Sequence, residues 1–249
     1  MTAPAAPAHL LAATLARDPA RPLITFYDDA TGERVELSAA TTDNWVAKSA
    51  NLLRDDLAVE AGSRVALLLP LHWQTAVLAL ATWALEAVVT DAIAGADVAA
   101  VEESRLPEAL DAPEVLGLSL RPMNAPLTAT PAGVVDYGAE VLAHGDRFAS
   151  YTPVDPDAPA LDLAGRAATG RELVAATAAY AVGPTDRLLT TLPLLTWEGL
   201  AAGLLAPLAA GAGVVMCRNA EAAALERRAR EERVTATAGV DVDGLPRLA

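Results

Sequence analysis

The sequence is poor in cysteine and in basic residues. Cys217 is the single cysteine among 249 residues, which excludes an intramolecular disulfide and favours a reducing compartment. The 18 Lys and Arg are outnumbered by 32 Asp and Glu, so the formal net charge is −14. Because this charge repels nucleic acid phosphates and anionic membrane surfaces, we expect no nucleic acid partner and no membrane partner.

Targeting signals and long apolar runs are also missing. The amino end has no basic segment and is interrupted by prolines, unlike a signal peptide. The most membrane-like run, residues 75–85, is too short to span a bilayer. A hydrophobic content of 53% is still enough to bury a core, although much of it is alanine. We therefore expect a soluble, cytoplasmic globular protein.

The spacings that hold metals or activate nucleophiles are absent from the sequence. His9, His72 and His144 lie far from one another and from Cys217, so no metal-binding spacing exists. No Gly-x-Ser-x-Gly elbow is present, and the adjacent carboxylates are typical of solvated turns and helix faces. We therefore predict no metal and no catalytic residue, and we expect Cys217 to be a small buried side chain.

Apolar periodicity predicts an α/β fold with parallel strands. A helix over residues 7–17 and a hairpin that turns at Gly32 come first, and strands at 64–70 and 87–90 flank a helix at 72–86. Prolines then break the pattern, which predicts a loop-rich middle. Alternation returns with a helix at 171–181, a strand at 186–193, a helix at 197–210, a strand at 213–217, a helix at 220–233 and a strand at 234–237.

The stretch GRAATGRE, residues 165–172, has the glycine spacing of a phosphate-binding P-loop without its chemistry. Arg171 and Glu172 stand where Lys and Ser/Thr would contact phosphate and magnesium, so both electrostatic roles are damaged. The preceding residues 160–163 form a poor strand pattern because Asp162 interrupts it. We predict an ordinary turn that leads into a helix.

A candidate ligand pocket follows the strand that ends at Pro193. Thr196 and Trp197 come in a short turn before a helix of small residues. Side chains at the carboxyl end of a parallel strand lie where α/β sheets bind ligands. We therefore predict that Thr191, Thr196, Trp197 and Gly199 line a pocket, with a core tryptophan under a loop as the alternative.

The run ERRAREER, residues 226–233, interleaves both signs of charge along a predicted helix. It is most simply explained as an exposed face with ion pairs, and an arginine-lined anion patch is the alternative.

Four segments, in this order, resemble the amino-terminal part of the adenylate-forming superfamily, the AMP-dependent synthetases and ligases that include acyl-CoA synthetases. They are residues 21–53, 62–90, 184–216 and 232–240. More closely, the chain resembles a short group of adenylation-like proteins. The resemblance implies a layered α/β sandwich like the N-terminal subdomains of these enzymes, without their C-terminal domain. We expect one such domain over residues 1–249, with 1–150 and 151–249 as candidate sub-lobes.

The resemblance also implies where ATP would bind. Members hold it with a Ser/Thr/Gly-rich loop ending in Pro-Lys-Gly, of which only Thr169, Gly170 and Arg171 are matched here. We interpret these three as vestigial and expect no cofactor. Thr196 stands where a family His lines the acyl pocket, and the later family motifs would lie beyond Ala249.

Three hypotheses follow from the sequence. The first is a non-catalytic homologue that acts as a binding or interaction module for an acyl-type ligand or a protein partner. The second is a subunit of a split acyl-activating enzyme, whose partner supplies the missing elements. The third is a self-associating structural protein that forms a homo-oligomer through apolar surface.

Overall fold

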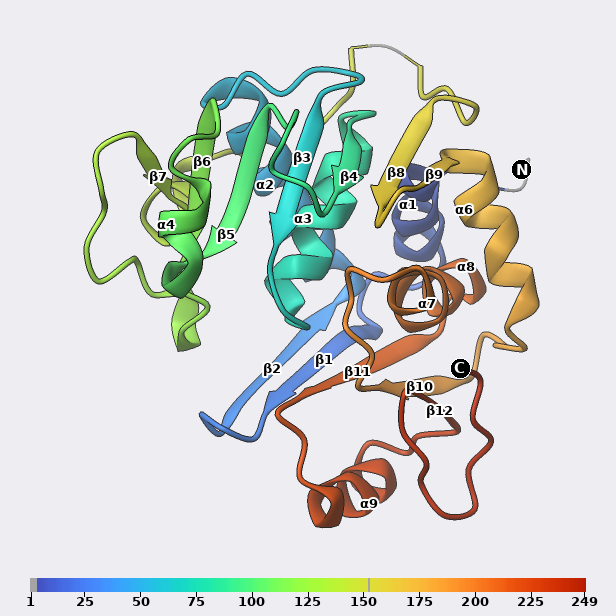
Figure 1. Ribbon diagram of the computed structural model, residues 1–249. Helices are drawn as coiled ribbons and strands as arrows, with labels where there is room; N and C mark the ends of the chain where they lie inside the picture. The colour runs from blue at the N-terminus through green and yellow to red at the C-terminus, as the bar shows by residue number, and fades with distance from the viewer. Residues whose placement is uncertain (1–3, 152) are drawn as a thin grey trace. The chain divides into compact units, whose positions relative to one another are not determined.

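A computed structural model describes residues 4–151 and 153–249 and divides into two compact units (Figure 1). Unit 1 is formed by the described residues of 1–43, 70–76 and 171–249, and unit 2 by those of 44–69 and 77–170. These limits are interleaved along the chain and differ from the candidate sub-lobes 1–150 and 151–249. The α/β fold with parallel strands that the periodicity predicted is confirmed.

Unit 1 contains a five-stranded sheet in the order β12-β10-β11-β1-β2. Neighbouring strands are parallel except for the antiparallel hairpin of β1 and β2, which turns through Gly32 at φ 75°. The predicted hairpin is therefore confirmed. The strands are β1 (Pro22–Asp28), β2 (Glu33–Ser38), β10 (Arg187–Thr190), β11 (Gly213–Arg218) and β12 (Ala236–Ala238).

The helices of unit 1 follow the predicted alternation. Helix α1 (Pro7–Arg17) is held to the end of α8 by Thr14, whose hydroxyl donates to the Leu208 carbonyl at 3.0 Å. The predicted helix over 197–210 is continuous, but its middle is a π-helical turn. The remaining elements are α6 (Gly170–Ala176), η4 (Thr177–Ala179), α7 (Trp197–Leu200), η5 (Ala201–Leu205), α8 (Ala206–Ala210) and α9 (Ala222–Glu231).

Helices α2 (Ala39–Asp55) and α3 (Trp73–Ala84) each have residues in both units. The side chain of Ser38 caps the start of α2, because it accepts a hydrogen bond from the Thr41 backbone N–H at 3.1 Å. In the described ranges, none of the helices combines the length and the apolar character needed to cross a bilayer.

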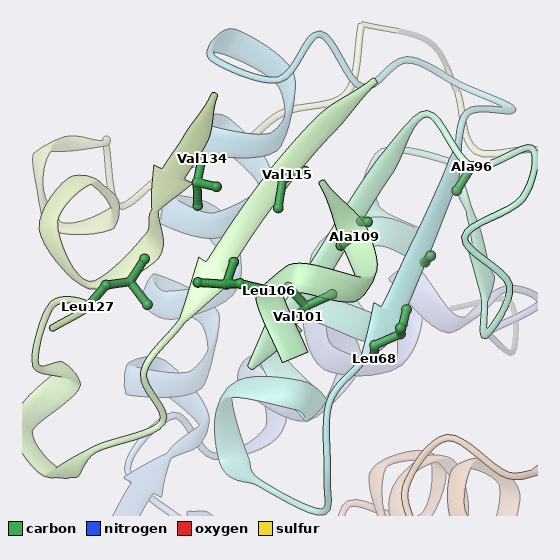
Figure 2. Close-up of a cluster of buried hydrophobic side chains, with 10 residues drawn as sticks. Leu68, Ala96, Val101, Leu106, Ala109, Val115, Leu127 and Val134 are labelled. Atoms are coloured by element: carbon green, nitrogen blue, oxygen red, sulfur yellow. The ribbon is translucent and has the colours of Figure 1, made fainter. Parts of the chain in front are cut away.

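Unit 2 contains a seven-stranded sheet in the order β7-β6-β5-β3-β4-β8-β9, parallel except for β9. Figure 2 shows Leu106 and Ala109 of the short helix α4 packed with Val101, Val115 and Val134 of the sheet. The elements are β3 (Arg64–Leu68), β4 (Val88–Thr90), β5 (Val98–Glu102), η1 (Glu103–Arg105), α4 (Leu106–Ala109), β6 (Glu114–Leu118), η2 (Pro122–Asn124), β7 (Val134–Asp136), α5 (Tyr137–Glu140), η3 (Val141–Ala143), β8 (Pro159–Leu163) and β9 (Arg166–Thr169).

The prediction that residues 160–163 form a poor strand is wrong. They belong to β8, which pairs in parallel with β4 and antiparallel with β9. Asp162 does not interrupt the strand, because its carboxylate accepts a hydrogen bond from the Arg64 guanidinium at 2.7 Å. Strand β3, which lies on the far side of β4 in the sheet, therefore supplies the partner that the local sequence does not reveal.

Candidate functional site

The segment between β10 and α7 has a fixed backbone, because Thr196 forms the N-cap of the helix. The Thr196 hydroxyl accepts a hydrogen bond from the Gly199 N–H at 3.0 Å and donates one to the Pro193 carbonyl at 2.9 Å. These two bonds close the turn at the carboxyl end of the strand. Thr196 and Gly199 are thus brought together as the sequence predicted, but through capping of the helix.

Gly199 allows the turn to approach the helix closely. A side chain there would clash with the Pro193 carbonyl oxygen and would lie 2.9 Å from the Leu194 carbonyl oxygen. One turn later, Gly203 of the π-helical η5 lies against the side chain of Thr190, the last residue of β10. Such π-helical turns are frequent at functional sites.

Apolar residues cover the carboxyl ends of β10 and β12. Leu192 packs with Leu248 and Ala249 onto the cluster that contains Leu188 and Ala202. The Thr191 N–H does not face a ligand space but donates to the Ala238 carbonyl at 3.1 Å. Trp197 is half-buried. A ligand pocket lined by Thr191, Thr196, Trp197 and Gly199 therefore stays a prediction.

The interval expected to be an ordinary turn before a helix is instead a hairpin followed by a helix. Ala164 and Gly165, with φ of 50° and 76°, join β8 to β9. Thr169 is the last residue of β9, and Gly170, where α6 begins, donates its N–H to the Ala158 carbonyl at 3.2 Å. The predicted turn was wrong in this respect, because Arg166–Thr169 gains its strand conformation from pairing with β8.

The turn of this hairpin is filled by a carboxylate. The Ala164 N–H donates to both carboxylate oxygens of Asp91, at 3.2 and 3.0 Å. A loop that binds phosphate would direct several free N–H groups towards the anion. Here the Ala164 N–H, at the tip of the turn, already donates to Asp91.

Unit 1 contains a charged network that the sequence did not reveal. Glu232 accepts hydrogen bonds from the Tyr27 hydroxyl at 2.5 Å, from Arg34 at 3.0 Å and from Arg187 at 2.6 Å. Burial alone would raise the pKa of Glu232, but these donors outweigh it and lower the pKa. The donors of this network all bond the same carboxylate. The network is best explained as a structural connection between the end of α9 and the sheet.

Arg228 corrects the expectation that the whole run 226–233 is an exposed face. Its side chain is 7% exposed, pairs with Asp29 at 2.6 Å and lies 4.0 Å from the centre of the Tyr27 ring. Beside it, Cys217 is buried as expected, and burial raises the pKa of its thiol to about 11. A thiol with so high a pKa is a poor nucleophile at neutral pH.

His72 is buried in unit 1 and lacks a complete set of hydrogen bonds. Its Nδ1 accepts from the Gln74 N–H at 3.1 Å, while its Nε2 lies 3.8 Å from the Glu33 carboxylate and has no hydrogen-bond partner among the described residues. Burial lowers the pKa of His72, although Glu33 opposes the shift. The side chain is 1% exposed, so it is a core residue and not a surface acid or base.

In the ranges that the structure describes, no three His, Cys, Asp or Glu side chains gather as a metal site. A cavity of about 370 Å³ lies in unit 2 between the end of α2 and residues 148–151. In it, the Arg54 guanidinium lies 5.1 Å from the ring centres of both Phe148 and Tyr151.

Comparison with known proteins identifies the family. No family model matches the chain. The TIGR03089 family protein of Mycobacterium tuberculosis is 45% identical over 235 residues, which cover 89% of this chain and 93% of that protein. The chain belongs to the TIGR03089 family.

Two solved structures show the fold of this TIGR03089 family member. An acyl-CoA synthetase of Brucella canis matches 92% of the chain with a TM-score of 0.78 and 18% identity. The anthranilate CoA ligase AuaEII, solved with anthranoyl-AMP, matches 96% with a TM-score of 0.78 and 12% identity. The chain spans about half the length of these enzymes, 46% and 50% respectively. The adenylate-forming α/β fold implied by the resemblance is therefore confirmed.

Proposed function

We propose that this TIGR03089 family protein is a non-catalytic homologue of acyl-CoA synthetases that acts as a binding or interaction module. The connection between β8 and β9 supports the proposal. The resemblance predicts a Ser/Thr/Gly-rich phosphate loop before α6, whereas the chain has a tight hairpin turn at Ala164 and Gly165. This turn is too short to surround a triphosphate.

The charge at the turn also supports a loss of ATP chemistry. Asp91 presents a carboxylate to the Ala164 N–H, so a phosphate at this place would meet a like charge. The lysine of the family loop has no counterpart, because Glu172, Leu173 and Val174 follow Arg171 where the family loop ends in Pro-Lys-Gly. A charged hydrogen-bond donor such as this lysine contributes several kcal/mol to transition-state stabilisation. The loss of the lysine is therefore incompatible with ordinary adenylation.

The experiment is ATP–pyrophosphate exchange by the purified protein over a panel of aliphatic, aromatic and amino carboxylic acids. We expect no exchange above the background without protein. Titration calorimetry is carried out with magnesium-ATP, AMP and coenzyme A. We expect no heat of binding for magnesium-ATP or for AMP. Exchange with any acid would contradict the proposal, and nucleotide binding without exchange would favour the split-enzyme hypothesis instead.

An Asp91→Asn variant serves as the matched control. The asparagine oxygen can still accept the bond from the Ala164 N–H, but the negative charge is gone. We expect this variant also to bind no ATP, because the turn supplies too few N–H groups whatever its charge. A gain of ATP binding would show that the short turn can hold phosphate, against the proposal.

A further inference from the structure

A cavity of about 320 Å³ lies in unit 1, between the last turns of α9 and the loop after β12. Ala229, Val234 and Val242 form an apolar floor and are only 5–8% exposed. The same three residues belong to a buried cluster with Leu189 and Val215 of the central strands. The floor is therefore the outer surface of a packed core, which gives the cavity a fixed shape.

Charges of both signs surround this apolar floor. Glu226, Arg230 and Arg233 come from α9 and its end, and Asp243 comes from the opposite loop. All four residues are exposed, and none of them forms an ion pair of 4.0 Å or less with another residue in the described ranges. The guanidinium groups of both arginines, and the two carboxylates, are therefore available to a ligand without breaking an existing ion pair.

On the neighbouring face of α9, two oppositely charged residues four positions apart do form an ion pair. Arg227 and Glu231, four residues apart, form an exposed ion pair at 3.8 Å. Glu226 and Arg230 have the same spacing in the order that favours pairing more, with the acid nearer the amino end. They nevertheless stay apart and both line the cavity.

Arg233 occupies a backbone position that favours glycine. Its φ is 54°, and the N–H groups of Arg233 and Val234 donate to the carbonyls of Arg230 and Ala229, at 3.2 and 2.8 Å. This is the left-handed end of a Schellman motif, where a side chain costs conformational energy. The helix dipole favours a cation here, although glycine would suit the backbone better.

We propose that this cavity binds a small zwitterion with an apolar body. Arg230 and Arg233 hold its carboxylate, Glu226 and Asp243 hold its ammonium group, and the apolar floor takes the rest of the molecule. Each unpaired charge of the rim then gains a partner of opposite sign, and the apolar body covers the exposed part of the floor.

This site uses α9, the residues at its end and the loop after β12, and none of the residues of the segment between β10 and α7. It does not require that the chain has lost adenylation. Exchange activity and zwitterion binding are measured separately, so either proposal can fail while the other holds.

The test is titration calorimetry with L-leucine, L-valine and L-phenylalanine as probes. 4-Methylpentanoate is leucine without its ammonium group, and 3-methylbutylamine is leucine without its carboxylate. We expect at least one amino acid to bind, and the two leucine analogues to bind at least about tenfold more weakly than leucine, because each leaves charged rim groups unpaired. Absence of binding by all three amino acids, or equal binding of an analogue, would overturn the proposal.

An Arg233→Gly variant separates binding from folding. We expect it to raise the melting temperature by about 3 °C, since glycine relieves the left-handed backbone, and to weaken binding at least about tenfold. Arg227→Ala on the neighbouring face is the matched control and should leave binding unchanged. Undiminished binding by Arg233→Gly would show that Arg233 does not contact the ligand and would refute the assignment.

Discussion

Gly199 determines whether the turn after β10 can close on its helix. The Gly199→Ala variant places a methyl group 2.9 Å from the Leu194 carbonyl and against the Pro193 carbonyl, which is fixed by the Thr196 cap. We expect a loss of about 2–3 kcal/mol in the free energy of unfolding, measured by urea denaturation. Gly183→Ala is the control, because its methyl group would meet only the Asp186 carboxylate at 3.4 Å. Equal stability of the two variants would refute this account of Gly199.

At the scale of elements, the sequence was sufficient to predict those strands and helices whose apolar pattern and turn residues lie within the segment itself. The apolar run of β3 and the hairpin of β1 and β2 were predicted because alternation and turn residues are local. Strand β5, with the sequence VAAVE, was not predicted, because its alanines show no strand preference and its conformation comes from pairing with β3 and β6 on either side. The segment Thr196–Gly199 was located by the rule for strand ends, whereas the Asp91 contact joins residues far apart in sequence and left no pattern to detect.

The outer edge of β12 is covered by the last residues of the chain. Thr237 donates its N–H to the Pro246 carbonyl at 2.9 Å and accepts from the Leu248 N–H at 2.8 Å. Deletion of residues 246–249 would leave these groups unpaired, and open edges invite pairing with another chain. We expect sedimentation velocity to show concentration-dependent association of the deletion variant and less of the intact chain. Arg247→Ala removes the exposed pair with Asp241 and the Nε bond to the Ala249 carbonyl but keeps the backbone bonds to Thr237, and it should behave like the intact chain.

For the molecule as a whole, the buried neutral His72 couples stability to pH. The pKa of His72 is lowered by burial, whereas in the unfolded chain histidine titrates near its ordinary pKa of about 6.5. The unfolded state therefore binds a proton first, and stability falls as the pH drops below about 6.5, by up to about 1.4 kcal/mol per pH unit. Glu232 also has a lowered pKa, but its contribution is lost only at the lower pH where free glutamates protonate. The change in stability between about pH 6.5 and pH 5 is thus caused mainly by the protonation of histidine.

A His72→Asn variant tests this coupling without breaking the local turn. The asparagine oxygen can accept the bond that Nδ1 accepts from the Gln74 N–H, while the titratable ring is removed. Urea unfolding between pH 7 and 5 should give a shallower loss of stability for the variant than for the intact chain. An identical dependence of stability on pH in both proteins would mean that His72 gains its proton as readily in the folded state as in the unfolded state. In that case the carboxylate of Glu33, 3.8 Å from Nε2, outweighs the cost of burying the charge.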